Sequence, residues 1–202
     1  MPSRAPVPPV VVRAPKYDLT ATKKILELGP DGIIFPMVTT AEEAERVISS
    51  TLYPPYGDRG FGPMNAMDYG FRDPFEYTKS SLDSVCRFIQ IEHKDTIENL
   101  DSIMKNKYIY GYIWGPNDLC GSHGMLSEMF TDKITAIIRE TTERLHSAGK
   151  YVGIASGGYS DKILKHWSSF DPDMLCAGAD FDFVRDGART NRINMEKIFK
   201  NK

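Results

Sequence analysis

Short apolar runs alternate with amphipathic stretches along the chain. The apolar runs predict strands near residues 10–12, 32–35, 85–92, 108–114, 151–155 and 174–177, the last with a continuation near 181–184. Apolar positions at helical spacing predict helices over 19–28, 40–48, 97–104, 131–147, 160–167 and 194–200. Repeated alternation of strand and helix is typical of a parallel α/β sheet.

These elements amount to about six strand–helix units, and two closures of the sheet fit them: a (β/α)8 TIM barrel or an open doubly wound sheet. A full barrel has eight strands and takes about 250 residues, whereas no strand fits before Val10. A barrel would therefore be truncated by two units at its amino-terminal end. We expect a single, partial barrel domain over residues 1–202.

Two local signals refine this picture. Thr40 and Glu43 form a capping box, which predicts the start of a helix at that point. Residues 53–70 are rich in glycine and proline and predict a long loop.

Composition and charge narrow the class of protein. A net charge of −2 and a pI near 6.1 argue against a nucleic-acid-binding protein, which needs a concentrated basic face. No apolar run approaches the ~20 residues that span a bilayer, and no secretory signal is visible. The three cysteines are far apart and have no metal-ligand spacing, so we expect reduced thiols in a cytoplasmic protein.

Two acids stand at the carboxyl ends of predicted strands. Glu92 ends the strand at 85–92, and Asp118 comes just after the strand at 108–114. Sites in parallel α/β folds are assembled at this edge, and paired carboxylates suit Mg²⁺ or Mn²⁺. The alternative is that both acids are solvated, or that one caps the next helix.

Other candidates are weaker. Arg13 ends the first strand and could bind a carboxylate or stabilise an oxyanion, although a surface arginine is the competing interpretation. Gln90 alternates with Glu92 and so shares its side of the strand. His93 should point to the opposite side, and His123 lies in a glycine-containing loop after Asp118.

Several segments together resemble the HpcH/HpaI aldolases, a family of metal-dependent aldolases that make and cleave bonds to pyruvate. They are residues 35–44 (FPMVTTAEEA), residues 53–62 (YPPYGDRGFG), Gln90-Ile-Glu92, and Gly115-Pro-Asn-Asp-Leu119. Their order and spacing match the family, and the resemblance covers nearly the whole chain.

The resemblance implies a (β/α)8 barrel of the phosphoenolpyruvate/pyruvate-binding type and roles for particular residues. It assigns the metal to Glu92 and Asp118. It assigns substrate contacts to Gln90, Asn117, Gly115 and Pro116. Arg13 matches the arginine that stabilises developing negative charge, and Glu27 matches an aspartate that raises the basicity of the catalytic histidine. Glutamate is the longer acid, so Glu27 departs from the family pattern.

The implied activity is a carbon–carbon lyase reaction: cleavage of a 4-hydroxy-2-oxo acid to pyruvate and an aldehyde, with a divalent metal as cofactor. Mg²⁺ is the first choice, with Mn²⁺ or Co²⁺ left open, and the family is commonly a homo-oligomer. In the family two strand–helix units precede the arginine strand and carry the general-base histidine, which nothing here matches. The alternatives are therefore an impaired, truncated homologue that binds metal or keto acid, and an acyl lyase resembling citrate lyase β.

Overall fold

The centre of the molecule is a parallel sheet whose strands follow one another in space as in sequence. The structure is a computed structural model and describes residues 8–15 and 17–200. The six strands are β1 (Val11–Arg13), β2 (Gly32–Phe35), β3 (Cys86–Ile91), β4 (Gly111–Trp114), β5 (Tyr151–Ala155) and β6 (Met174–Cys176). Each pairs in parallel with the next, so β1 and β6 are the two edges of the sheet within the described residues.

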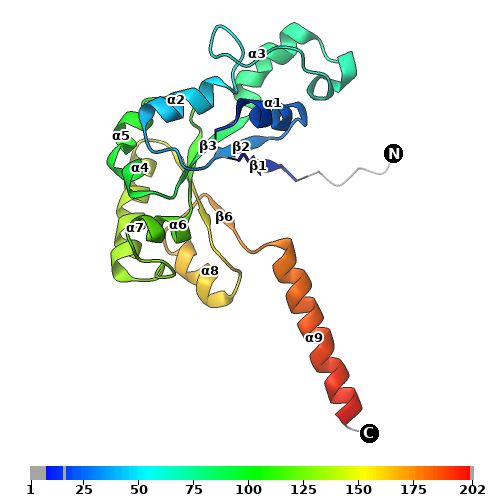
Figure 1. Cartoon of the computed structure of the whole chain (residues 1–202), viewed down its shortest axis with the longest axis vertical. Coiled ribbons are helices and arrows are strands. Elements are labelled where there is room, and N and C mark those ends of the chain that lie inside the picture. The colour runs from blue at the N-terminus through cyan, green and yellow to red at the C-terminus, as the bar shows by residue number, and fades with distance from the viewer. Residues whose placement is uncertain (1–7, 16, 201–202) are drawn as a thin grey trace.

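Helices connect the strands, as the alternating pattern predicts. They are α1 (Leu19–Glu27), α2 (Ala41–Ser49), the 3₁₀ helix η1 (Asn65–Gly70), α3 (Pro74–Ser84), α4 (Lys94–Glu98), α5 (Leu100–Ile103), α6 (Pro116–Ser122), α7 (Asp132–Ser147), α8 (Asp161–Ser168) and α9 (Asp180–Lys200). Helices α2, α4, α5 and α7 lie along one side of the strands (Figure 1).

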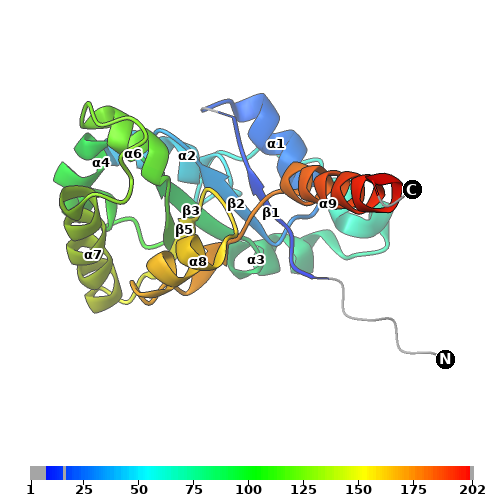
Figure 2. The same ribbon diagram turned by 90° about the horizontal axis from the view of Figure 1, so that it is seen from below.

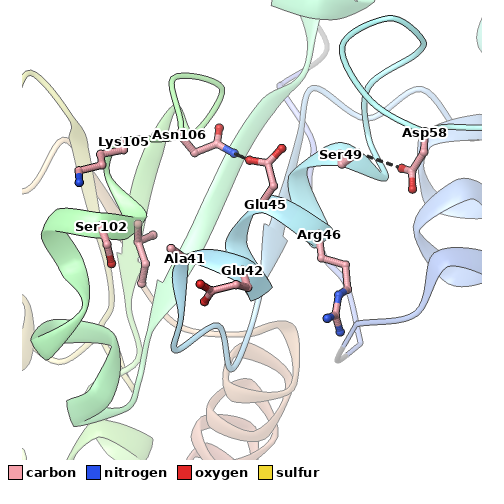
Figure 3. A pocket seen from close by; sticks show the side chains of 10 residues that line it. Ala41, Glu42, Glu45, Arg46, Ser49, Asp58, Ser102, Lys105 and Asn106 are labelled. Atoms are coloured by element: carbon pink, nitrogen blue, oxygen red, sulfur yellow. Dashed lines mark hydrogen bonds between the residues drawn. The ribbon is translucent and has the colours of Figure 1, made fainter.

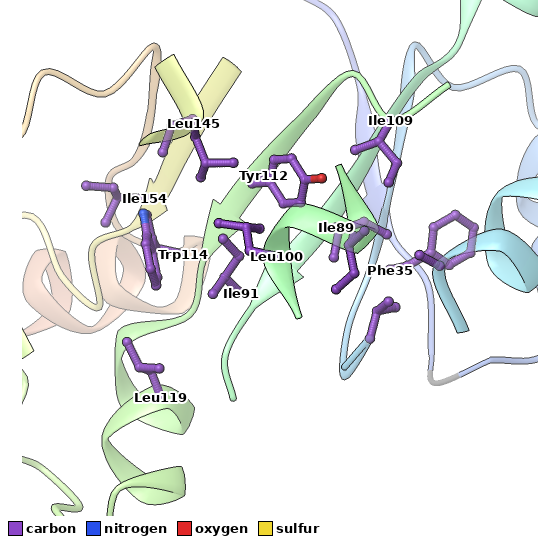
Figure 4. Close-up of a cluster of buried hydrophobic side chains, with 14 of the residues drawn as sticks. Phe35, Ile89, Ile91, Leu100, Ile109, Tyr112, Trp114, Leu119, Leu145 and Ile154 are labelled. Atoms are coloured by element: carbon purple, nitrogen blue, oxygen red, sulfur yellow. The ribbon is translucent and has the colours of Figure 1, made fainter. Parts of the chain in front are cut away.

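The side of the sheet that faces these helices is the apolar core. Ile33 and Phe35 of β2 point toward the helices. Ile89, Tyr112 and Trp114 continue the same layer across β3 and β4. These side chains are at most 1% exposed and pack together (Figure 4). Because these residues are buried against the helices, the residues that alternate with them lie on the opposite face of the sheet.

The opposite face carries the candidate chemistry. Arg13 is in register with Ile34, and Ile34 with Phe88. Residues in register on neighbouring strands point to the same side, and so does every second residue along a strand. Arg13 and Gln90 therefore share this face.

The capping box predicted at the start of α2 is confirmed. The Thr40 Oγ1 atom accepts a hydrogen bond from the Glu43 backbone N–H at 3.2 Å, and Glu43 Oε2 accepts from the Thr40 N–H at 3.3 Å. The predicted loop over 53–70 is correct to residue 64 and then becomes η1.

The end of the chain differs from the prediction. A strand near 181–184 is wrong, and the terminal helix is much longer than 194–200, because a single 21-residue helix, α9, spans both segments. Gly178 breaks the strand with φ +85°, Asp182 accepts from the Ala179 N–H, and Arg185 pairs with Asp182 at 2.8 Å. The apolar residues at 181–184 stay exposed in α9, which runs away from the rest of the molecule (Figures 1 and 2).

Two further helices have no counterpart in the sequence prediction. The α3 helix buries only Ser81, so it lacks the apolar face that reveals a helix in sequence. The short α6 helix begins at Pro116, directly after β4, and includes Asp118 in its first turn. Among the described helices, none combines the length and the hydropathy needed to cross a bilayer.

Candidate functional site

The two predicted acids meet at the carboxyl edge of the sheet. Glu92 follows β3, and Asp118 lies in the first turn of α6, after the neighbouring strand β4. Glu92 is only 4% exposed. Burial raises its pKa, and the negative charge of Asp118 raises it further. The sequence prediction that these carboxylates lie together is therefore supported by their electrostatic interaction.

Gly115 makes room for this arrangement. A Cβ atom at this position would lie 2.7 Å from Gln90 Nε2, 3.0 Å from Glu92 Cβ and 3.2 Å from Glu92 Oε2. Such approaches are too short for real carbon contacts, so any larger residue would push Gln90 and Glu92 aside. The absence of a side chain at Gly115 is thus part of the geometry of the site.

Gln90 adds a third oxygen. Its Oε1 atom is buried and has no hydrogen-bond partner among the described residues. A buried acceptor without a donor is costly, so Gln90 Oε1 is available to a ligand. The Gln90 atom that approaches Gly115, as Glu92 Oε2 also does, is the donor Nε2.

Arg13 contributes a positive charge. It is exposed at the end of β1, and its charge lowers the pKa of Glu92 against the effect of burial. It is therefore close enough to act on an anion bound at this edge.

The remaining predicted contacts lie in α6. Pro116 is buried at the first turn, where its missing N–H costs nothing. Asn117 is exposed and reaches toward the end of β5: its Nδ2 atom is 3.7 Å from the position of a Cβ on Gly157. Gly115, Pro116, Asn117 and Asp118 thus form one turn that borders the acid pair.

Sequence reasoning missed Met37. Its backbone N–H donates to Glu92 Oε1 at 2.7 Å, across 55 positions in sequence. Its φ of +54° is left-handed, which is rare for a residue other than glycine. The only signal in the sequence is its place just after β2, at the same edge as the acids.

Glu27 lies apart from this group. The α1 helix begins after the carboxyl end of β1 and ends before the amino end of β2. Its last residue, Glu27, therefore lies toward the amino ends of the strands, away from Glu92 and Asp118. Its Oε2 accepts from the Met64 N–H at 2.9 Å, and its Oε1 is 3.6 Å from Arg59 Nη2. The catalytic role expected for Glu27 stays a prediction.

Three of the four histidines contact other groups, and His123 Nε2 is buried without a hydrogen-bond partner among the described residues. His93 caps α4 by accepting from the Asp95 N–H at 3.2 Å. His123 follows α6; burial lowers its pKa, and nearby lysines add to this effect. His146 bonds to Asp173 at 3.1 Å, and His166 packs against Trp167. In the described part of the chain, none of these four rings makes a hydrogen bond to Glu92 or Asp118.

Whether the cluster suits a cation depends on its oxygen atoms. Within residues 8–15 and 17–200, no group of three or more His, Cys, Asp and Glu side chains could hold a metal ion. The Glu92 and Asp118 carboxylates are two ligands of the kind that Mg²⁺ uses, and it keeps waters in its other positions. The Glu92 and Asp118 side chains therefore fit a hard divalent cation that keeps several waters.

The largest surface hollow described lies elsewhere. It has a volume of about 590 Å³ and is an open groove between α2 and α5 (Figure 3). Its wall contains Glu45, which accepts from Asn106 at 2.7 Å, and Ser49, which donates to Asp58. It contains none of the predicted site residues.

Comparison with known proteins agrees with the geometry. The family model described as HpcH/HpaI aldolase/citrate lyase matches residues 3–162. The chain is 32% identical over 185 residues to a hydroxypyruvate/pyruvate aldolase of Deinococcus radiodurans, covering 92% of this chain and 66% of that protein. It is 31% identical over 191 residues to a 2-keto-3-deoxy-L-rhamnonate aldolase of Escherichia coli, covering 95% of this chain and 70% of that protein. The chain thus spans about two thirds of the length of these relatives.

A solved structure supports the predicted fold. The crystal structure of an HpcH/HpaI aldolase from Desulfitobacterium hafniense superposes with a TM-score of 0.83 at 23% identity, over 93% of this chain and 72% of that one. The six strand–helix units are therefore a part of a (β/α)8 barrel, and the open doubly wound sheet is excluded.

Proposed function

The chain belongs to the HpcH/HpaI aldolase/citrate lyase family, and from this premise we propose that it is an aldolase acting on 2-oxo acids. The observation that carries the proposal is the carboxylate pair of Glu92 and Asp118 beside the positive charge of Arg13. A cation and an anionic keto acid complement these two halves of the site.

Glu92 and Asp118 would hold a divalent cation, with Mg²⁺ preferred and Mn²⁺ or Co²⁺ as alternatives. When bound, such an ion acts as a Lewis acid that polarises a carbonyl oxygen. The raised pKa of Glu92 agrees with this role. Burial and the charge of Asp118 destabilise the ionised carboxylate, and a nearby positive charge stabilises it.

The chain's own residues orient and stabilise the substrate. Arg13 stabilises the negative charge that develops on the keto oxygen when a proton leaves C3. Gly115, Pro116 and Asn117 border the acid pair and bind the carboxylate end of the keto acid, while Gln90 fixes its orientation. Support of the catalytic base by Glu27 requires contact between Glu27 and that base.

Cleavage also needs a base for the 4-hydroxyl proton. His93 caps α4, His146 bonds to Asp173 and His166 packs on Trp167, while His123 Nε2 is buried without a partner among the described residues. Removal of a methyl proton from pyruvate and cleavage of a 4-hydroxy-2-oxo acid are therefore different reactions, and each has its own assay.

The names of the relatives favour a class of substrate. One acts on hydroxypyruvate or pyruvate and the other on a 2-keto-3-deoxy sugar acid. We propose that the substrate here is pyruvate together with an aldehyde, or the 4-hydroxy-2-oxo acid that they form.

Exchange of the pyruvate methyl protons in D₂O, followed by proton NMR with Mg²⁺, tests this function. We expect exchange that requires the metal and is lost in Glu92→Gln and Asp118→Asn. Asp132→Asn, which changes an exposed acid at the start of α7, is the matched control and should exchange normally. A folded chain without exchange contradicts the proposal, as does exchange that survives both acid substitutions.

Two alternatives give other results in the same series. A protein that binds metal and keto acid without turnover would show Mg²⁺-dependent pyruvate binding but no exchange. An acyl lyase resembling citrate lyase β would cleave a CoA thioester and leave free hydroxy-oxo acids unchanged. The family description, which includes citrate lyase, is the reason to include that substrate.

We also propose that the chain forms a homo-oligomer through α9. This helix buries none of its residues, and Phe181, Val184, Met195 and Ile198 are each at least 46% exposed. Large apolar side chains on one face of a helix are typical of a contact surface. Light scattering should give a multiple of 22.8 kDa, reduced in Val184→Glu but not in Thr190→Glu on the opposite face. A mass of 22.8 kDa for the unaltered chain contradicts this proposal.

A further inference from the structure

Met37 combines an unfavourable backbone conformation with a contact to the acid pair. It follows β2 by two positions and has φ +54°. An L-residue with a Cβ rarely adopts this conformation, and such residues cluster at sites where the surroundings hold them in place. Its side chain is 41% exposed, so burial of that side chain does not explain the conformation.

The segment around Met37 is held from two sides. The Thr96 hydroxyl, in a fully buried side chain, donates to the Val38 carbonyl at 2.8 Å, and Asn99 Nδ2 donates to the Thr39 carbonyl at 3.0 Å. The Thr39 N–H in turn donates to Glu43 Oε2 at 2.7 Å. The turn after β2 is therefore tied both to α2 and to the residues that follow Glu92.

The result of this conformation is a hydrogen bond to one oxygen of Glu92. The Met37 N–H lies 2.7 Å from Oε1, while Oε2 is the oxygen nearest the position of a Cβ on Gly115. The hydrogen bond opposes the effects of burial and of Asp118 by lowering the pKa of Glu92. Of the two Glu92 oxygens, it is thus Oε1 that accepts from the backbone of Met37.

We propose that Met37 is a positioning residue, whose left-handed backbone presents its N–H to Glu92 and so prepares this carboxylate for a cation. The inference rests on the proposed function, because it gives Glu92 the role of a metal ligand. It assigns the effect to the backbone of Met37 and not to its side chain. Groups that orient a ligand in this way commonly contribute about 10–100-fold to metal affinity.

The test uses substitutions that separate backbone from side chain. Met37→Gly keeps the N–H and makes φ +54° easy to adopt, whereas Met37→Val keeps an apolar side chain but makes that conformation more costly. Asp171→Val is the matched control, because Asp171 has the same φ of +54° in an exposed turn before β6. Binding of Mn²⁺ alone is measured by electron paramagnetic resonance, together with thermal unfolding without metal.

We expect Met37→Val to weaken Mn²⁺ binding about tenfold or more, and Met37→Gly to change it by less than about twofold. Asp171→Val should lower the unfolding temperature but leave the Mn²⁺ affinity unchanged. Equal losses of affinity in Met37→Gly and Met37→Val would overturn the inference, because the side chain would then be responsible. Normal affinity in a folded Met37→Val would overturn it as well.

A second measurement does not depend on the folding of Met37→Val or on metal. Amide exchange in the metal-free chain should show a protected Met37 N–H that loses protection in Glu92→Ala and keeps it in Asp118→Asn. A Met37 N–H that exchanges equally in all three proteins contradicts the hydrogen bond. If the unaltered chain binds no Mn²⁺ while Met37 is protected, the proposed function fails and this inference fails with it.

Discussion

Glu92 and Glu27 are both glutamates, but their electrostatic surroundings differ. Each accepts a hydrogen bond from a distant backbone N–H, that of Met37 at 2.7 Å and that of Met64 at 2.9 Å. Their neighbours differ. Glu92 faces the carboxylate of Asp118, whereas Glu27 is 3.6 Å from the Arg59 guanidinium.

The charge of Glu27 has a partner within the chain, and among the described residues Glu27 Oε1 and Arg59 Nε make no hydrogen bond. The Arg59 side chain is 1% exposed, and its guanidinium lies over the Tyr53 ring with 4.5 Å to the ring centre. Burial raises the pKa of Tyr53, which therefore stays neutral. Glu27 thus connects α1 to the loop at 53–64, and its charge is compensated within the chain.

The difference shows what identifies a cation site. A buried carboxylate alone does not identify one, because Arg59 can satisfy it from within the chain. At Glu92 the charge of Asp118 has the same sign and raises the pKa, and the charge of Arg13 opposes it. We propose that the Glu92–Asp118 pair takes a further positive charge from a bound cation, whereas Glu27 is paired with Arg59 within the chain.

The largest expected effect concerns Asp118→Asn. Mg²⁺ at about a hundred times its Kd should stabilise the unaltered chain by about 2.7 kcal/mol, and the variant by almost nothing. Without metal, the variant should be more stable by up to about 1 kcal/mol, since the repulsion of Glu92 is removed. Thermal unfolding with and without Mg²⁺ measures both. A variant that is destabilised without metal would mean that Asp118 has a structural role.

Arg59→Gln should be the most damaging change in the Glu27 region. It removes the cation from a partly buried carboxylate, and we expect a loss of roughly 2 kcal/mol in the free energy of unfolding. The affinity for Mn²⁺ should change by less than about twofold, because the two regions lie at opposite edges. Urea unfolding and metal titration measure the two quantities. A large loss of Mn²⁺ affinity in a folded variant would show that the two regions are energetically coupled, which contradicts the comparison.

Gly115→Ala should affect only the carboxyl edge. Its added Cβ would lie 2.7 Å from Gln90 Nε2 and must displace Gln90 or Glu92. We expect Mn²⁺ affinity to fall about tenfold, measured by calorimetry. Gly187→Ala in α9, where a Cβ meets nothing within 4 Å, is the control and should bind Mn²⁺ normally. Normal binding by Gly115→Ala would show that the crowding at this turn is unimportant.

Glu27→Gln has the smallest expected effect. The Met64 hydrogen bond can persist to the amide oxygen, but the buried Arg59 loses its counter-charge. The unfolding free energy should fall by about 1 kcal/mol, less than in Arg59→Gln, which also loses the contact of the guanidinium with Tyr53. If Glu27 has the catalytic role expected from the family, kcat falls while KM and Mn²⁺ affinity stay the same. Steady-state cleavage of a 4-hydroxy-2-oxo acid distinguishes these outcomes, since a purely structural Glu27 leaves kcat unchanged at temperatures where the variant is folded.

The predictable parts of the molecule are those with local signals. The apolar runs located β2 and β5 to the residue, and Thr40 with Glu43 located the start of α2. The acid pair was predictable because the ends of neighbouring parallel strands meet at one edge, so Glu92 and Asp118 could be brought together without coordinates.

The other parts depend on contacts between distant residues. The left-handed conformation of Met37 is fixed by Thr96 and Asn99, about 60 positions away, and no local pattern reveals it. The partner of Glu27 is Arg59, 32 positions further along. In α9 the exposed apolar residues at 181–184 look like a strand, because sequence shows apolar character and not whether it is buried.

Binding of Mn²⁺ to the metal-free chain is the most direct test of the contrast between the two glutamates. Electron paramagnetic resonance should give one bound ion per chain, lost in Glu92→Gln and retained in Glu27→Gln. No binding by the unaltered, folded chain, or an equal loss in both variants, would contradict the assignment of the cation to the carboxyl edge of the sheet.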